Sequence, residues 1–159
     1  MSHITIKNNP SLDGMAEIIP DIVFSKDGLK LQIINPWWDR VNGSTPSYPL
    51  VVFVQGSGWT FPNVWMEMPQ LCRLAGRGYA VAAVTHRNCY DGYPFPACLE
   101  DVKTAIRFLR CHGREYGINT EKIGIWGTSS GGNLALLTAL TIGDERYRTD
   151  EYKEYSDRV

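Results

Sequence analysis

The sequence lacks the features that mark several classes of protein. Its 16 basic and 17 acidic side chains give a net charge of −1 and form no basic block, so no patch is expected to hold a nucleic-acid backbone or an anionic membrane. No apolar run approaches the roughly 18 residues of a membrane span, and the amino terminus has no apolar signal core. We therefore expect a cytoplasmic protein without nucleic-acid or membrane partners.

Cysteine and histidine are scarce and scattered. The cysteines at positions 72, 89, 98 and 111 show no C-x-x-C spacing, so we expect reduced and mostly buried thiols. The histidines at positions 3, 86 and 112 do not form a metal-binding cluster. The sequence therefore predicts no metal and no cofactor.

The chain instead contains short apolar runs that alternate with helical patterns, in a composition that is 43% hydrophobic and sufficient for the core of one domain. Apolar segments on either side of Lys26-Asp27-Gly28 predict a hairpin over residues 18–25 and 29–35. Further strands are predicted at residues 50–54, 79–84 and 123–126, and helices at residues 64–76, 97–110 and 134–142. This order predicts a mostly parallel α/β sheet behind an antiparallel hairpin, with helices on both faces.

Two helices carry specific expectations about their surroundings. In the helix at 97–110, an apolar stripe faces the core and four charged side chains are expected to face water: Glu100, Lys103, Arg107 and Arg110. The helix at 134–142 is apolar almost all round, so it is expected to have protein on both sides. Trp126, immediately before the G-T-S-S-G segment at residues 127–131, is expected in the core.

The segment that carries the chemistry is G-T-S-S-G at residues 127–131, between a predicted strand and a predicted helix. This G-x-S-x-G pattern is typical of a nucleophile elbow, in which a serine projects from a sharp turn. The positions two before and two after the serine must be nearly free of side chain. Gly127 and Gly131 have that spacing around Ser129, whereas Ser130 has Thr128 two residues before it. The pattern therefore favours Ser129 as nucleophile, with simple capping of the helix as the alternative.

Four stretches together resemble the amino-terminal half of an α/β-hydrolase, in the esterase branch that includes hormone-sensitive-lipase-like and carbohydrate esterases. They are Q-G-S-G-W at 55–59, T-H-R at 85–87, F-P-A-C-L-E-D-V-K at 95–103 and I-G-I-W-G-T-S-S-G-G at 123–132. The resemblance runs from about residue 18 to the carboxyl terminus. It implies an α/β-hydrolase fold and a small-molecule ester as substrate.

The resemblance also implies roles for the loop that begins at residue 55. In the family this loop reads H-G-G-G and supplies N–H groups to an oxyanion hole. By position, the donors here are the N–H groups of Ser57, Gly58 and Ser130. Gln55 replaces the histidine of the family and Ser57 replaces its middle glycine; neither change removes an N–H.

Other positions match the family as supports for this loop or as pocket residues. Arg87 and Asp101 are expected to form a partly buried ion pair that braces the loop, with two solvated charges as the alternative. Aromatic side chains of the two loops that follow strand ends are expected to line an acyl or aryl pocket; these are Trp59, Phe61, Trp65 and Tyr93, with Tyr90 and Phe95.

The remaining members of a catalytic triad are missing from the expected positions. In this family the order along the chain is Ser, then Asp or Glu, then His, yet all three histidines precede Ser129. His86 ends a predicted strand and is the alternative candidate for the base, but a histidine at such a position is more often a loop or core residue. We therefore expect a single incomplete domain over residues 1–159, with a lead-in at 1–17, truncation after the elbow helix and a charged tail at 143–159.

Two classes of function fit these residues. The first is a serine carboxylic-ester hydrolase that acts through an acyl-enzyme on Ser129, with the triad acid and histidine absent from this chain. Within this class, a peptidase or lipase of the same fold is the alternative. The second is a non-catalytic remnant, or a subunit that needs a partner chain. In either case the open sheet edge and the apolar last helix predict self-association of the chain.

Overall fold

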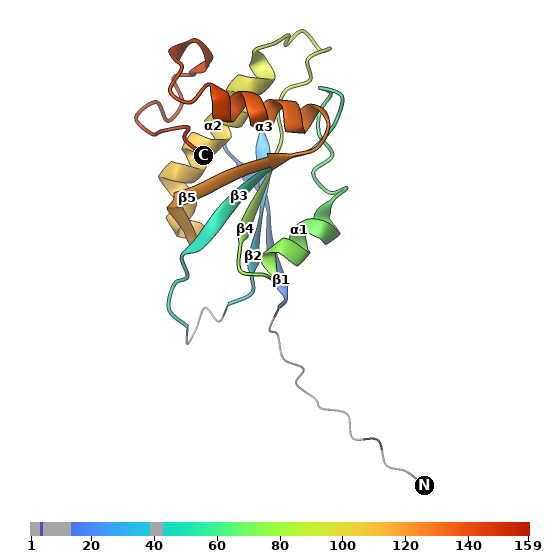
Figure 1. Ribbon diagram of the computed structural model, residues 1–159, viewed down its shortest axis with the longest axis vertical. Coiled ribbons are helices and arrows are strands. Elements are labelled where there is room, and N and C mark those ends of the chain that lie inside the picture. The colour runs from blue at the N-terminus through green and yellow to red at the C-terminus, as the bar shows by residue number, and fades with distance from the viewer. Residues whose placement is uncertain (1–3, 5–13, 39–42) are drawn as a thin grey trace.

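A mixed sheet of five strands forms the centre of the protein (Figure 1). The structure is a computed structural model that describes residue 4 and residues 14–38 and 43–159. In spatial order the strands are β1 (Ala16–Val23), β2 (Lys30–Pro36), β4 (Ala80–Val84), β3 (Tyr48–Val54) and β5 (Ile118–Gly127). β1 and β2 form the predicted antiparallel hairpin, and β2 also pairs antiparallel with β4. Most of the lead-in predicted at residues 1–17 lies outside the described residues.

β3 lies in the sheet between β4 and β5 and runs parallel to both. Residues 50–54 of β3 pair in sequence with residues 123–127 of β5, from Leu50 opposite Ile123 to Val54 opposite Gly127. Parallel strands end at the same edge of a sheet. The loop after Val54 and the turn after Gly127 therefore leave the sheet side by side.

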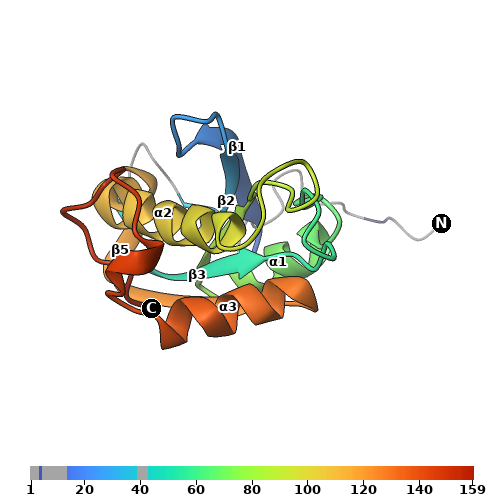
Figure 2. The same cartoon turned by 90° about the horizontal axis from the view of Figure 1, so that it is seen from above.

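Three α-helices in the described residues pack on the strands: α1 (Met68–Ala75), α2 (Ala97–His112) and α3 (Ser130–Leu140). A short 3-10 helix at Gly113–Tyr116 follows α2, and another at Glu145–Tyr147 follows α3. α1 and α2 belong to separate buried clusters on either side of the strands (Figure 1), and α3 runs beside β3 and β5 (Figure 2). None of the helices in the described ranges is long and apolar enough to cross a membrane.

α1 is shorter than the helix predicted at residues 64–76. Residues 64–67 form turns, and the helix begins at Met68 with Pro69 in its first turn. Proline is suited to this position because it lacks an N–H that would have no acceptor there. The apolar residues before the helix still join the core, since Val64 is buried with Met68 and Leu71.

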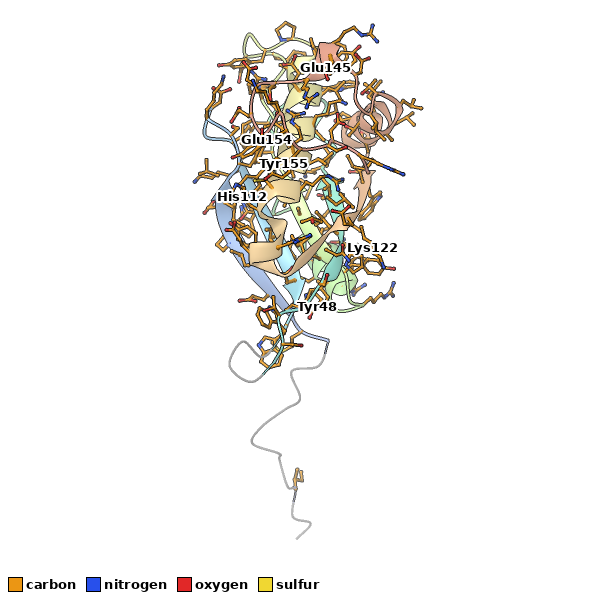
Figure 3. All side chains as sticks on the ribbon, turned by 90° about the vertical axis from the view of Figure 1, so that its left-hand side faces the viewer. Tyr48, His112, Lys122, Glu145, Glu154 and Tyr155 are labelled. Atoms are coloured by element: carbon orange, nitrogen blue, oxygen red, sulfur yellow. The ribbon has the colours of Figure 1, made fainter. Side chains whose placement is uncertain are left out.

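The prediction for the charged side of α2 is wrong at two positions. Lys103 and Arg107 are buried, because residues 143–159 fold back over this helix rather than extending into solvent. Arg107 donates to the hydroxyl of Thr149 at 2.7 Å and to the carbonyl of Glu151 at 3.1 Å. Figure 3 shows Glu145, Glu154 and Tyr155 of this tail beside α2, with His112 near the end of the helix. Hydrogen-bonding side chains attach the tail, together with Tyr147, Tyr152 and Val159, which pack against the core.

Around α3, apolar side chains that were expected to be buried are exposed. Trp126, expected in the core, is 44% exposed, although its ring lies 4.9 Å from that of Phe53 between centroids. Leu136 and Leu140 of α3 are also exposed, whereas Leu134 is buried in the core that includes α2. The described residues therefore cover one side of this helix and leave the other side open, next to the edge strand β5.

Candidate active site

Ser129 lies at the corner between β5 and α3, the position predicted for a nucleophile. Its φ is 51° and its ψ is −123°, a backbone conformation that residues with a side chain rarely adopt. The side chain is exposed, and its hydroxyl has no hydrogen-bond partner among the described residues. Backbone strain at an exposed serine in a strand-to-helix turn is the arrangement of a nucleophile elbow.

The two glycines that flank Ser129 are required by close backbone contacts. A Cβ on Gly127 would lie 2.3 Å from the carbonyl oxygen of Gly131, and a Cβ on Gly131 would lie 2.1 Å from the carbonyl oxygen of Val54. Real Cβ atoms do not approach other atoms this closely. The turn can therefore place α3 against the end of β3 only when both positions lack side chains.

Gly56 joins the loop after β3 to this corner, and it was not among the predicted site residues. A Cβ on Gly56 would lie 2.8 Å from the Cβ of Ser129. The N–H of Gly56 donates to the hydroxyl of Thr128 at 3.0 Å. The first glycine of Q-G-S-G-W, Gly56, is the sequence signal for this contact, because a close approach of two backbones favours glycine.

The three predicted oxyanion donors have different surroundings. The N–H of Ser57 donates to the hydroxyl of Ser130 at 3.0 Å, so it already has an acceptor within the protein. Gly58 follows with a φ of +62°, a conformation that glycine adopts without strain. The N–H of Ser130 is at the first residue of α3, where a helix provides no acceptor for it. Ser57 and Ser130 therefore form a second link between the loop and the elbow.

Arg87 and Asp101 are in direct contact between the loop after β4 and α2. The backbone N–H of Arg87 donates to Asp101 Oδ2 at 2.8 Å, and its guanidinium lies 2.7 Å from Oδ1. The hydrogen bond to Asp101 raises the pKa of Arg87, against the effect of burial. The guanidinium carbon also lies 5.2 Å from the ring centroid of Tyr93. This cluster holds the loop of residues 85–96 to the first turns of α2.

The aromatic side chains predicted to line one pocket lie in three different locations. Trp59 lines a hollow of about 380 Å³, whereas Phe61 and Trp65 line another of about 350 Å³. Tyr93 lies against Arg87. The Trp59 hollow adjoins the elbow, because it is also lined by Asn133, whose N–H donates to the carbonyl of Ser129 at 3.1 Å. Its remaining lining residues are Cys89, Tyr90, Pro94, Phe95 and Cys98.

His86 is placed as a structural residue. It is fully buried, with Nδ1 2.8 Å from the carbonyl oxygen of Arg87, and Nε2 has no hydrogen-bond partner among the described residues. Burial lowers the pKa of His86, although the Arg87 carbonyl and the Asp101 charge act against this shift. His112 pairs with Glu115 at the far end of α2, at 2.9 Å. Neither contact links a histidine to Ser129.

The residues in and around the site match known proteins. The family model described as BD-FAE matches residues 40–158. Esterase LipC from Mycobacterium tuberculosis is 31% identical over 121 residues, which cover 76% of this chain and 30% of LipC.

Solved structures show the same similarity. A bifunctional GH43-CE protein from Bacteroides eggerthii has a TM-score of 0.77 and 33% identity, over 96% of this chain and 22% of that one. The butyrate-bound esterase Est2 from Thermogutta terrifontis has a TM-score of 0.72 and 27% identity, over 94% of this chain and 52% of that one. The chain thus spans about half or less of the length of these relatives. It belongs to the BD-FAE family and is an α/β-hydrolase of the esterase branch.

Proposed function

We propose that Ser129 is the nucleophile of a carboxylic-ester hydrolase that acts on a small acyl or carbohydrate ester. The observation that carries this proposal is the exposed, strained position of Ser129 with Gly56 packed against its Cβ. This contact brings the backbone of the loop after β3, which carries the proposed donor N–H groups, against the residue that carries the hydroxyl. The esterase relatives support the same reaction class.

In the proposed reaction, Ser129 Oγ attacks the ester carbonyl carbon and the carbonyl oxygen becomes an oxyanion. The N–H groups of Gly58 and Ser130 would donate to this oxyanion, an interaction that strengthens as the charge develops. The alcohol leaves with a proton, and water then hydrolyses the acyl-serine. The Trp59 hollow would hold the acyl or alcohol group, because it adjoins the elbow and is lined mainly by apolar and aromatic side chains.

A serine hydroxyl needs a general base to attack efficiently at neutral pH. We propose that the histidine and its carboxylate come from outside these 159 residues, since all three histidines precede Ser129 and the chain spans only part of its relatives. The alternative is a non-catalytic remnant or a subunit that depends on a partner chain. This alternative is favoured by the Ser57 N–H, which donates to the hydroxyl of Ser130 and so is not free to donate to an oxyanion.

Hydrolysis of p-nitrophenyl acetate by the wild type, Ser129→Ala and Ser47→Ala tests the proposal. Ser47 is an exposed serine at the other end of β3 and serves as the control. We expect Ser129→Ala to lose the activity and Ser47→Ala to retain it. Without a histidine, the rate should not exceed the ~10³–10⁴-fold over water that remains when triad members are removed. Equal rates for wild type and Ser129→Ala would reject Ser129 as nucleophile.

A further inference from the structure

Two of the four cysteines lie together in the wall of the Trp59 hollow. Cys89 is in the loop after β4 and Cys98 is in the first turn of α2. Their sulfur atoms are 3.4 Å apart and form a thiol–thiol hydrogen bond. All four cysteines are free thiols, and Cys72 and Cys111 provide an internal comparison for this pair.

The two thiols differ in accessibility. Cys98 is almost completely buried, whereas Cys89 is half-buried and lines the hollow. Burial and the neighbouring Cys89 thiol raise the pKa of Cys98 to about 12. A reagent that enters the hollow should therefore react first at Cys89, with Cys98 in position as the second sulfur.

The backbone around Cys89 links this pair to the candidate active site. The N–H of Cys89 donates to the carbonyl of Trp59 at 2.9 Å, and Trp59 follows the predicted oxyanion donors. Trp59 has a φ of +62°, so its backbone is in the left-handed region. A covalent bond between Cys89 and Cys98 would tie the loop of residues 85–96, and through it Trp59, to α2.

We propose that Cys89 and Cys98 form a reversible dithiol–disulfide pair in the wall of the Trp59 hollow, oxidised by a hydroperoxide. The Cys89 thiolate attacks one peroxide oxygen, the O–O bond breaks, and the departing oxygen leaves as water or an alcohol after taking a proton. The resulting sulfenic acid is attacked by the Cys98 sulfur, so the S–S bond forms and the S–O bond breaks. The hydroxide takes the Cys98 proton and leaves as water. The two sulfurs are oxidised and the peroxide is reduced.

Formation of this disulfide requires only a small movement of the two sulfur atoms. A disulfide has an S–S length of about 2.05 Å, so the sulfurs must approach by roughly 1.4 Å from their present separation. Cys89 is in the loop after β4 and Cys98 is in the first turn of α2, so rotation of the two short side chains can supply much of this approach. Neither Cys72 nor Cys111 has a sulfur partner among the described residues. The proposal does not depend on ester hydrolysis, because its readout is a covalent change.

Oxidation of the wild-type chain with hydrogen peroxide tests it. After treatment, free thiols are alkylated with iodoacetamide, and the digest is analysed by mass spectrometry with and without prior reduction. Trypsin leaves Cys89 and Cys98 in one peptide, residues 88–103, because no Lys or Arg lies between Arg87 and Lys103. We expect this peptide to lose two hydrogen atoms on oxidation and to react with iodoacetamide at both cysteines only after reduction. Cys72 and Cys111 should remain alkylated.

A second measurement tests the link to the loop. The oxidised wild type should melt at a higher temperature than the reduced form and return to the lower value with dithiothreitol. Cys89→Ser should show no such shift. We choose Cys89 because it is half-buried, so a serine should disturb the fold less there than at the buried Cys98. Full alkylation of Cys89 and Cys98 after oxidation, or disulfides spread equally over all four cysteines, would overturn the proposal.

Discussion

The ammonium group of Lys103 donates a hydrogen bond to the carboxylate of Asp157, with 2.5 Å between Nζ and Oδ2. The same ammonium donates to the carbonyl of Thr141 at 2.6 Å, and the other oxygen of Asp157 accepts from the N–H of Gly143 at 3.0 Å. α2, the end of α3 and the last residues of the chain therefore meet at one buried ion pair.

Replacement of this ammonium should loosen the carboxyl-terminal tail. Removal of one partner of a buried ion pair leaves an uncompensated charge and costs about 3–5 kcal/mol, so we expect a loss of this order in the free energy of unfolding for Lys103→Met, measured in urea. Arg146→Met is the matched control, because Arg146 pairs with Asp144 with its side chain 77% exposed. A similar small effect for both variants would contradict the structural role of Lys103.

The same pair predicts a dependence of stability on pH. Burial raises the pKa of Asp157, but hydrogen bonds from Lys103 and Gly143 and the charge of Lys103 outweigh it, so the pKa is lowered. A carboxyl with a lowered pKa contributes stability above its ordinary value of about 3.9, and this contribution is lost as the pH falls through the folded-state pKa. We expect wild type to lose stability in this acidic range. The loss should be smaller in Lys103→Met, and identical acid profiles would refute the assignment.

The elbow glycines give a prediction in which two effects have opposite signs. Gly131 lies inside α3, where alanine is favoured over glycine by about 1 kcal/mol. A Cβ at this position would, however, lie 2.1 Å from the carbonyl oxygen of Val54, and overpacking costs about 1–3 kcal/mol or more. We expect Gly131→Ala to lower the urea midpoint. Gly124→Ala on β5 should have little effect, because its Cβ would meet nothing within 4 Å; a stabilised Gly131→Ala protein would show that the turn is looser than described.

The hydrogen bond from Ser57 to Ser130 predicts an unusual gain of function. Ser130→Ala removes the acceptor of the Ser57 N–H, which is then free to donate to an oxyanion. Since one such donor is worth ~10²–10³ in rate, we expect hydrolysis of p-nitrophenyl acetate to rise measurably. Thr128→Val is the matched control, because it removes the acceptor of Gly56, whose N–H is not a predicted donor. A lower rate for Ser130→Ala would instead show that the link holds the loop in place.

The exposed side of α3 predicts self-association of the isolated chain. Leu136 and Leu140 are exposed beside β5, the strand at one edge of the described sheet. We expect concentration-dependent oligomers in analytical ultracentrifugation, and a larger monomer fraction for a Leu136→Glu, Leu140→Glu double variant. Val23→Glu is the control at the other edge, where β1 has an irregular register near Asp21. A wild type that stays monomeric and melts cooperatively would contradict this expectation.

The elements that depend on local pattern were predictable from the sequence. Buried strands such as β4 appear as short apolar runs, and the glycine spacing around Ser129 marks the turn after β5. The contact of Gly56 with Ser129 follows once β3 and β5 are known to be parallel neighbours. For the strands and the turn, the cause lies within a few residues of the effect, whereas the Gly56 contact also requires the pairing of two distant strands.

The errors share a different cause, which is packing between segments far apart in sequence. Lys103 and Arg107 have the charge and helical spacing of surface residues, and only the return of the tail across α2 buries them. Trp126 is a large apolar residue of the kind found in cores, yet the described segments leave it 44% exposed. The proximity of Cys89 and Cys98 depends on how one loop folds onto a helix, which neither residue indicates alone.

The pairing of β3 with β5 fixes the position of Ser129 relative to the loop after β3 in the candidate active site. A slip of one residue between these strands would displace Ser129 along the sheet by about 3.3 Å, more than the length tolerance of a hydrogen bond. The spacing between Ser129 and the backbone of the loop after β3 is thus set by hydrogen bonds between the strands, which do not depend on the side chains that the loops carry. A change of side chain in the loop after β3, for example at Gln55, would consequently leave this backbone spacing unchanged.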